Sequence, residues 1–128
     1  MNDITKRKRG ELLDYIAREV VAEDAVKCVA VIGSVAVGAA HAGSDIDAVV
    51  FMDPLDLHAV PAEFQWMPDA GTYHGIFVDL PGAVQFDFKR LDLKQWSHAS
   101  FQWPESLTAE LASGWVAFDR DGVASALI

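Results

Sequence analysis

Two aspartates stand two positions apart in the segment Ser44-Asp45-Ile46-Asp47, directly before a run of apolar residues. If this run is a strand, Asp45 and Asp47 share one face, with α-carbons about 7 Å apart, and Ile46 belongs to the other face. Two carboxylates about 5 Å apart repel by roughly 3 kcal/mol at an effective dielectric constant near 20, so a cation should compensate them. Hard oxygen ligands that are open to a substrate favour Mg²⁺, which also binds substrate phosphates.

A glycine–serine pair, Gly33-Ser34, ends the apolar run that precedes this motif. Glycine lets the main chain approach a phosphate closely, and the serine hydroxyl and the N–H groups of a following helix start can hold the anion. Ser44 could cap or steady the loop that presents Asp45, and His41 in the same loop could touch a phosphate. Together with the carboxylates, this turn predicts a site for a metal-bound nucleoside triphosphate.

A third carboxylate should approach from a neighbouring strand. Asp87 lies in the middle of an expected strand over residues 84–90, between two phenylalanines that should face the core. Aspartate is disfavoured inside strands, so its presence there invites a reason. Asp79 is the alternative, but it lies beside a turn, where aspartate is ordinary. Asp92 stands at an expected helix start and is interpreted as its cap.

Hydrophobic periodicity and turn residues predict the elements that must position these side chains. Helices are expected over residues 4–21, 35–40, 91–100 and 104–113, strands over 26–32, 45–52, 76–80, 84–90 and 115–118, and a helix start over 123–128. The stretch 53–73 is expected to be a loop with at most one short helix. The order predicts an α/β (α+β) domain with a mixed β-sheet flanked by helices, in which 76–80 and 84–90 form a hairpin.

The composite motif resembles the signature of the DNA polymerase β-like nucleotidyltransferase superfamily, whose members include aminoglycoside nucleotidyltransferases, CCA-adding enzymes and the small MNT-type domains of bacteria and archaea. The resemblance runs from Gly33-Ser34 through Gly38 to Ser44-Asp45-Ile46-Asp47 and the apolar residues that end at Phe51. The spacing of the two halves is much more specific than either half alone. The third carboxylate extends the resemblance to residue 87, and the resemblance implies the nucleotidyltransferase fold.

The resemblance also implies roles for five residues. Asp45 and Asp47 would bind two Mg²⁺ ions that carry a nucleoside triphosphate, with ATP as the expected nucleotide. Asp87 would share a metal or accept a proton from the acceptor, while Gly33 and Ser34 would hold the outer phosphates. Two metal ions about 4 Å apart can stabilise both the attacking and the leaving oxygen. The implied reaction moves a nucleoside monophosphate to a hydroxyl of a small molecule or a protein and releases pyrophosphate.

Composition limits the class of protein. The 128 residues are 52% hydrophobic and 23% charged, which is enough apolar material for the core of one domain over residues 1–128. The formal net charge of −9 disfavours extended nucleic-acid binding. It suits a cationic small substrate or a basic protein partner, but the solubility of an ordinary acidic protein is the favoured interpretation. The basic run at residues 6–9 is interpreted as the solvated start of the first helix. Trp96 and Trp103 are expected to pack rather than to stack on a base.

Cysteine usage and hydropathy bear on location. Cys28 is the single cysteine and lies within an apolar run, which predicts a packed thiol in a reducing compartment. The basic cluster near the N-terminus is not followed by the apolar run of a signal peptide, and no stretch approaches the roughly 20 apolar residues of a membrane span. We therefore expect a cytoplasmic protein without membrane contact.

The apolar segment 123–128 has no polar cap, and it bears on the function hypotheses. It indicates either a minimal domain cut from a longer protein or a segment that docks on a partner, such as a second copy in a homodimer. Many members of the resembled superfamily carry a C-terminal helical domain, which we expect this chain to lack. The alternative functions are a non-catalytic or antitoxin-like partner protein of the same fold and the catalytic half of a larger resistance-type enzyme. The three carboxylates favour activity.

Overall fold

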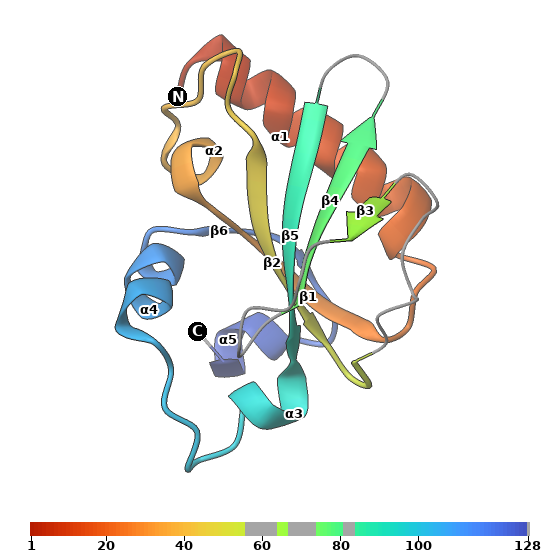
Figure 1. Cartoon of the computed structure of the whole chain (residues 1–128), viewed down its shortest axis with the longest axis vertical. Coiled ribbons are helices and arrows are strands. Elements are labelled where there is room, and N and C mark those ends of the chain that lie inside the picture. The colour runs from red at the N-terminus through yellow and green to blue at the C-terminus, as the bar shows by residue number, and fades with distance from the viewer. Residues whose placement is uncertain (56–63, 67–73, 81–83, 128) are drawn as a thin grey trace.

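A computed structural model of the chain describes residues 1–55, 64–66, 74–80 and 84–127 (Figure 1). In chain order the elements are α1 (Asp3–Tyr15), the π-helical η1 (Ile16–Val20), β1 (Val26–Ile32), α2 (Gly33–Val37), β2 (Ile46–Met52), β3 (Phe64–Trp66), β4 (His74–Leu80), β5 (Val84–Asp92), α3 (Leu93–Trp96), α4 (Glu105–Ala112), β6 (Trp115–Asp119) and α5 (Val123–Leu127). No helix among these residues is long and apolar enough to cross a membrane.

The described strands form one six-stranded sheet with the order β3-β4-β5-β2-β1-β6. Strands β2 and β5 pair in parallel, and the other described pairs are antiparallel. The expected hairpin is confirmed, because β5 pairs antiparallel with β4 over the whole length of β4. The predicted α+β architecture with a mixed sheet is therefore confirmed, and it places β2, the strand that follows the Asp-x-Asp motif, near the centre.

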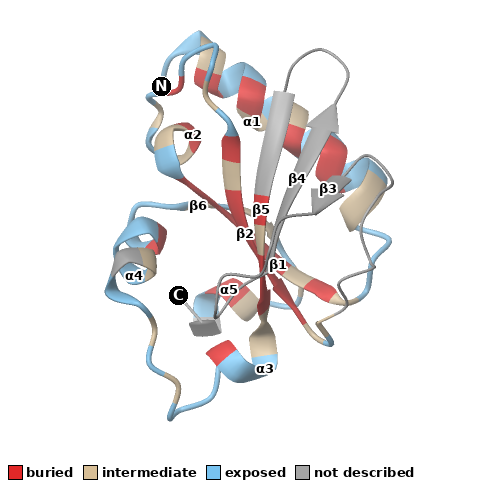
Figure 2. Cartoon of the chain, in the orientation of Figure 1, coloured by how far each residue is buried: buried red, intermediate tan, exposed pale blue. Residues whose placement is uncertain are grey.

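Helices cover both faces of the sheet (Figure 1). One core cluster joins α1 and η1 to one face of β1 and β2, and a second joins α3, α4 and α5 to the opposite face. In β2 the even-numbered residues belong to the α1 cluster, whereas Val49 and Phe51 belong to the second. Figure 2 shows the resulting run of buried residues along β1 and β2. Since side chains alternate along a strand, Asp47 lies on the face that carries α3, α4 and α5.

Local sequence explains several element ends. Asn2 caps α1, because its side chain accepts a hydrogen bond from Thr5 N at 2.7 Å. The predicted cap Asp92 is confirmed, because its Oδ1 accepts a hydrogen bond from Lys94 N at 3.1 Å at the start of α3. Gly38 ends α2 with a φ of 82°, a left-handed conformation that glycine adopts readily.

Some boundaries differ from the predictions. The single helix expected over 4–21 becomes α1 followed by one π-helical segment, in which Val21 N donates to Ile16 O at 3.0 Å. Apolar spacing shows which face a helix buries but is too coarse to detect one widened turn. The helix expected over 91–100 covers only α3, because β5 continues to Asp92. The helix expected over 35–40 begins and ends earlier, as α2.

The region predicted to be a loop with at most one short helix contains the strand β3, so this prediction is wrong for residues 64–66. A strand of three residues among prolines is too short for an alternating pattern to be recognised. The rest of this stretch that falls on 56–63 and 67–73, and the turn expected at 81–82, lie outside the described residues.

Two predictions about packing are confirmed. Cys28 is a fully buried free thiol in the second core cluster. Trp96 and Trp103 pack there as expected, with ring centroids 5.1 Å apart, and Trp96 also contacts Phe51 and Phe101 at centroid distances of 6.4 and 4.8 Å. This aromatic group packs on the same sheet face as Asp47, near Phe51 at the opposite end of β2 from the motif loop.

Candidate functional site

Gly33 and Asp47 lie against each other at the end of the β1–β2 pair. Antiparallel pairing aligns Ile32 with Asp47, so Gly33 follows β1 directly beside this carboxylate. A Cβ atom added to Gly33 would lie 3.1 Å from Asp47 Oδ2. Gly33 also has a φ of 72°, which side chains rarely tolerate. Both constraints explain glycine at this position, and they bring the predicted phosphate turn next to one predicted metal ligand.

Asp87 occupies the register position beside Asp47. The parallel pairing of β2 with β5 aligns these two residues. Paired positions on neighbouring strands share a face, and adjacent strands run about 4.8 Å apart. Asp79 lies on β4, one strand farther from β2, where it pairs with Gln85. The register therefore places the Asp87 position, and not the Asp79 position, next to the Asp-x-Asp motif.

Asp45 lies exposed at the entrance to β2, whereas Asp47 is half-buried. The loop before Asp45 is closed by its own hydrogen bonds. His41 N donates to Ser44 Oγ at 3.0 Å, and Ser44 N donates to His41 O at 3.0 Å. His41 Nδ1 accepts a hydrogen bond from Gly43 N at 3.1 Å. Ser44 thus steadies the loop as predicted, and the Nδ1 atom of His41 is engaged inside it.

The Asp-x-Asp motif, the predicted phosphate turn at Gly33 and the Asp87 register position thus meet at one end of the strands β1, β2 and β5. Residues 13–96 match the family model described as "Nucleotidyltransferase domain". This chain belongs to the nucleotidyltransferase domain family. The match covers more than half of the chain and includes the Gly33–Phe51 motif and Asp87. No curated protein matches the chain.

Family membership confirms the superfamily predicted from the motif. General nucleotidyl transfer from a nucleoside triphosphate is the chemistry that the family supports, and the family also includes non-catalytic members. Within this nucleotidyltransferase domain the described side chains contain no group of three or more His, Cys, Asp or Glu residues that could hold a metal ion. Asp45 and Asp47 supply two carboxylates of the kind that a hard divalent cation prefers.

Lys8 and Arg9 correct one prediction. The basic run was expected to be solvated, which holds for the exposed Lys6 and Arg7 but is wrong for the buried Lys8 and the partly buried Arg9. Lys8 Nζ donates to Ser44 O at 2.8 Å, and the guanidinium of Arg9 donates to two carbonyls of α2. Helical spacing could have found Lys8, because it falls three residues after the buried Thr5 on the helix face that packs on the sheet.

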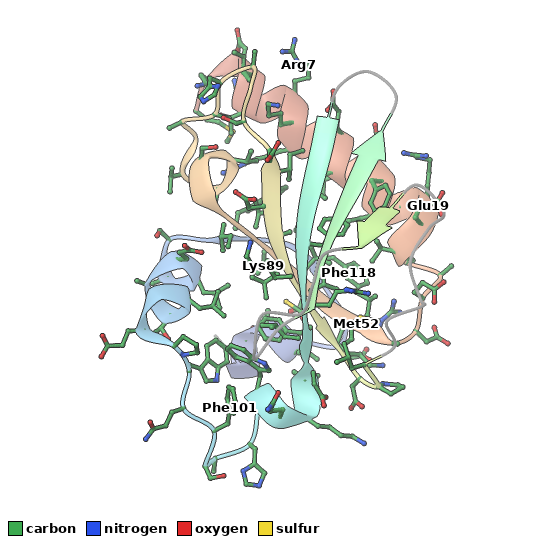
Figure 3. All side chains as sticks on the ribbon, viewed as in Figure 1. Arg7, Glu19, Met52, Lys89, Phe101 and Phe118 are labelled. Atoms are coloured by element: carbon green, nitrogen blue, oxygen red, sulfur yellow. The ribbon has the colours of Figure 1, made fainter. Side chains whose placement is uncertain are left out.

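Lys89 is a second residue that the sequence interpretation missed. It is half-buried on β5, two residues after Asp87, and it is labelled in Figure 3. Its register partner is Val49, which belongs to the second core cluster, so the Lys89 position shares the sheet face of Asp47. The i, i+2 spacing from Asp87 is the signal that would have found it, once β5 was recognised as a strand.

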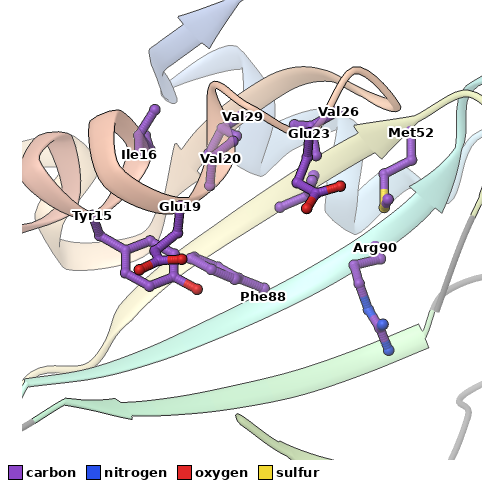
Figure 4. Close-up of a pocket in the computed structure, with 11 residues that line it drawn as sticks. Tyr15, Ile16, Glu19, Val20, Glu23, Val26, Val29, Met52, Phe88 and Arg90 are labelled. Atoms are coloured by element: carbon purple, nitrogen blue, oxygen red, sulfur yellow. The ribbon is translucent and has the colours of Figure 1, made fainter. Parts of the chain in front are cut away.

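The opposite sheet face holds a mostly apolar pocket beneath η1 (Figure 4). Its polar lining includes Glu19, Glu23 and the buried Arg90, while Phe88 and Met52 form part of its floor. On β5, the pocket residues Phe88 and Arg90 alternate with Asp87 and Lys89. On β2, the pocket residue Met52 belongs to the first core cluster, whose residues alternate with those of the second cluster. The pocket is therefore separated from the candidate site by the sheet itself and is not part of it.

Proposed function

We propose that this protein is an active Mg²⁺-dependent nucleotidyltransferase that moves a nucleoside monophosphate from a nucleoside triphosphate, with ATP as the expected nucleotide, to a hydroxyl of a small molecule or a protein. The observation that supports it most directly is the meeting of three positions from separate segments. Gly33 lies against the Asp47 carboxylate, and Asp47 is the register partner of Asp87. A packing role alone would not require two aspartates on adjacent strands near the centre of a sheet.

Asp45, Asp47 and Asp87 would hold the Mg²⁺ ions in this proposal. Their oxygens match the ligand preference of Mg²⁺, and an exposed Asp45 leaves room for substrate phosphates to complete the coordination. When bound, the ions would neutralise the triphosphate and stabilise the attacking and leaving oxygens. Three carboxylates at neighbouring positions repel one another, and this repulsion supports a cation here.

Gly33 and Ser34 would hold the outer phosphates. Gly33 has no side chain to keep a phosphate away from the backbone, and the partly buried Ser34 offers a hydroxyl beside it. Lys89 would add a positive charge on the same sheet face, where it offsets the carboxylates and attracts the triphosphate. The outer phosphates would then rest at the turn, with the α-phosphorus toward Asp45 and Asp47.

The proposed reaction balances without a further reactant. The acceptor oxygen forms a bond to the α-phosphorus, the bond from that phosphorus to the bridging β-phosphate oxygen breaks, and pyrophosphate leaves. The acceptor proton passes to the third carboxylate, for which Asp87 is the candidate. Positioning of the acceptor in line with the leaving oxygen supplies much of the rate enhancement in such transfers.

The test is a labelling experiment with the purified protein, Mg²⁺, each α-labelled nucleoside triphosphate and fractionated cell lysate as the source of acceptors. We expect one triphosphate to label an acceptor and to release pyrophosphate. Asp45→Asn and Asp47→Asn should each reduce transfer more than about 100-fold, because even partners outside the first ligand shell typically cost 10–100-fold. Asp14→Asn, at an exposed position of α1, is the control and should transfer normally.

Two outcomes would contradict the proposal. If Asp45→Asn retains both Mg²⁺-dependent ATP binding and transfer, the assigned carboxylates are not the metal ligands. If the wild-type protein binds Mg²⁺–ATP but transfers nothing to any fraction, the chain is one of the non-catalytic members of its family. The antitoxin-like partner function would then be the better assignment.

A further inference from the structure

The N-terminal end of α1 is tied to the motif loop by hydrogen bonds from side chains to the main chain. Asn2 Nδ2 donates to Ala40 O at 3.0 Å, and Thr5 Oγ1 accepts from Ala40 N at 3.0 Å. The backbone N–H and C=O groups of Ala40 are therefore both satisfied from this end of α1. Because these contacts join residues 35 to 38 positions apart, they fix the start of the loop to the helix, in addition to the hydrogen bonds that the loop makes within itself.

Arg9 extends this contact to α2. Its Nε donates to Val35 O at 3.0 Å, its Nη2 donates to Ala36 O, and its guanidinium lies 4.6 Å from the ring centroid of Trp115. The last carbonyls of a helix have no partner within that helix, and a cation satisfies them well. Arg9 therefore ties α2 to α1 and at the same time contacts Trp115 of β6.

Lys8 makes the contact closest to the metal-ligand motif. It is only 5% exposed, and its Nζ donates to Ser44 O at 2.8 Å. The Ser44 carbonyl belongs to the peptide that leads into Asp45. A buried ammonium is costly unless it is hydrogen-bonded, so the helix and this peptide hold each other in place. Lys8 thereby restricts the orientation of the Ser44–Asp45 peptide and, with it, the backbone position of the exposed Asp45.

We propose that Lys8 is a positioning residue of the nucleotidyl-transfer site, which fixes the Ser44–Asp45 peptide so that Asp45 and Asp47 can share one metal ion. This inference rests on the proposed function and deepens it. Asp47 is held by strand pairing, whereas Asp45 precedes the strand and needs another support. Lys8 provides that support from an element outside the motif, and it acts through the backbone without touching the substrate.

The experiment compares Lys8→Met, Lys8→Arg and the matched control Lys6→Met on the same helix. Methionine keeps an apolar stem but removes the donor, whereas arginine restores a cationic donor. The primary readout is the Mg²⁺ concentration that half-saturates binding of α,β-methylene-ATP, an analogue that resists transfer. A second readout is hydrogen exchange of the backbone amides at residues 40–45, and thermal unfolding verifies that each variant is folded.

We expect Lys8→Met to raise the half-saturating Mg²⁺ concentration about tenfold, the size typical of partners outside the first ligand shell. Exchange at residues 40–45 should accelerate in parallel, Lys8→Arg should recover most of both losses, and Lys6→Met should match the wild type. If Lys8→Met does not fold, Lys8→Leu, which also lacks a donor, is judged by the same measures. If Lys8→Met acted only through a general loss of stability, Lys8→Arg would not selectively restore the Mg²⁺ dependence.

Two failures are distinguishable. If the wild type binds the analogue with normal Mg²⁺ dependence and folded Lys8→Met or Lys8→Leu shows the same dependence, the positioning role of Lys8 is overturned while the proposed function stands. If the wild type shows no Mg²⁺-dependent binding of any triphosphate, the proposed function fails and the inference fails with it.

Discussion

At the scale of single residues, Gly33 is the position where backbone conformation and site chemistry meet. Two constraints disfavour any side chain at this position. Gly33 has a φ of 72°, and an added Cβ atom would lie only 3.1 Å from Asp47 Oδ2. We predict that Gly33→Ala lowers the free energy of unfolding by about 1–2 kcal/mol, the cost of the left-handed conformation. It should also displace the Asp47 carboxylate and reduce transfer by a larger factor than this loss explains. Urea unfolding and the labelling assay measure the two effects.

Gly10 is the matched control for this substitution. It lies inside α1, and a Cβ added there would meet nothing within 4 Å. Gly10→Ala should therefore stabilise the protein by about 0.5–1 kcal/mol, because alanine is the better helix former. If Gly33→Ala behaves like Gly10→Ala in both assays, the close approach of Gly33 to Asp47 has no functional meaning.

At the scale of elements, Arg120 joins the end of β6 to the junction between η1 and β1. Its Nε donates to Val26 O at 2.9 Å, and its Nη2 donates to Val21 O at 3.0 Å. Its guanidinium also lies 5.0 Å from the ring centroid of Phe118. These hydrogen bonds bridge segments 94 to 99 positions apart and hold the last strand on the sheet.

We predict that Arg120→Met lowers the free energy of unfolding by about 1.5–3 kcal/mol, since hydrogen bonds to charged groups contribute amounts of this size. Arg18→Met, at an exposed position of η1, should change it by less than about 0.5 kcal/mol. Denaturant unfolding of both variants provides the measurement. Equal stabilities would mean that β6 is held by its strand pairing with β1 alone.

The elements also show what the sequence could predict. The bounds of β1 agree with the prediction and those of β2 agree within one residue, because β-branched apolar runs next to turn residues are a strong signal. Asp45 and Asp47 could be recognised for the same reason. The structural role of Lys8 could not be derived from charge alone, since a basic run usually marks a solvated surface and its hydrogen bond to Ser44 O crosses 36 positions. The widened turn η1 has no composition signal either.

At the scale of the whole molecule, the acidic chain should lose stability at alkaline pH. Burial, with a further contribution from the negative charge of Asp119, raises the pKa of the Cys28 thiol from its ordinary value of 9.0 to about 12. Between these values the unfolded chain binds fewer protons than the folded chain. The free energy of unfolding therefore falls as the pH rises above 9.0, whereas below it both states keep the proton and this contribution is complete.

We predict that the wild type loses up to about 1.4 kcal/mol per pH unit more than Cys28→Ala between about pH 9.5 and 10.5, the slope of a single linked proton. Urea unfolding of both proteins across this range isolates the thiol, because the other groups titrate in both. The net charge of −9 becomes more negative over the same range in both proteins and adds a shared loss through self-repulsion. Parallel pH profiles would show that the Cys28 thiol ionises as readily in the folded protein as in the unfolded chain.

The parallel pair of β2 and β5 has a consequence for how the molecule folds. Its partners Asp47 and Asp87 are forty positions apart, whereas β1 with β2 and β4 with β5 pair through much shorter connections. Closing a segment of forty residues costs on the order of 3 kcal/mol of chain entropy, so these two local pairs should form before the parallel pair. On the proposed mechanism, a chain caught before that step carries the phosphate turn and two carboxylates without the third. Transfer activity would then require that the pairing of β2 with β5 is complete.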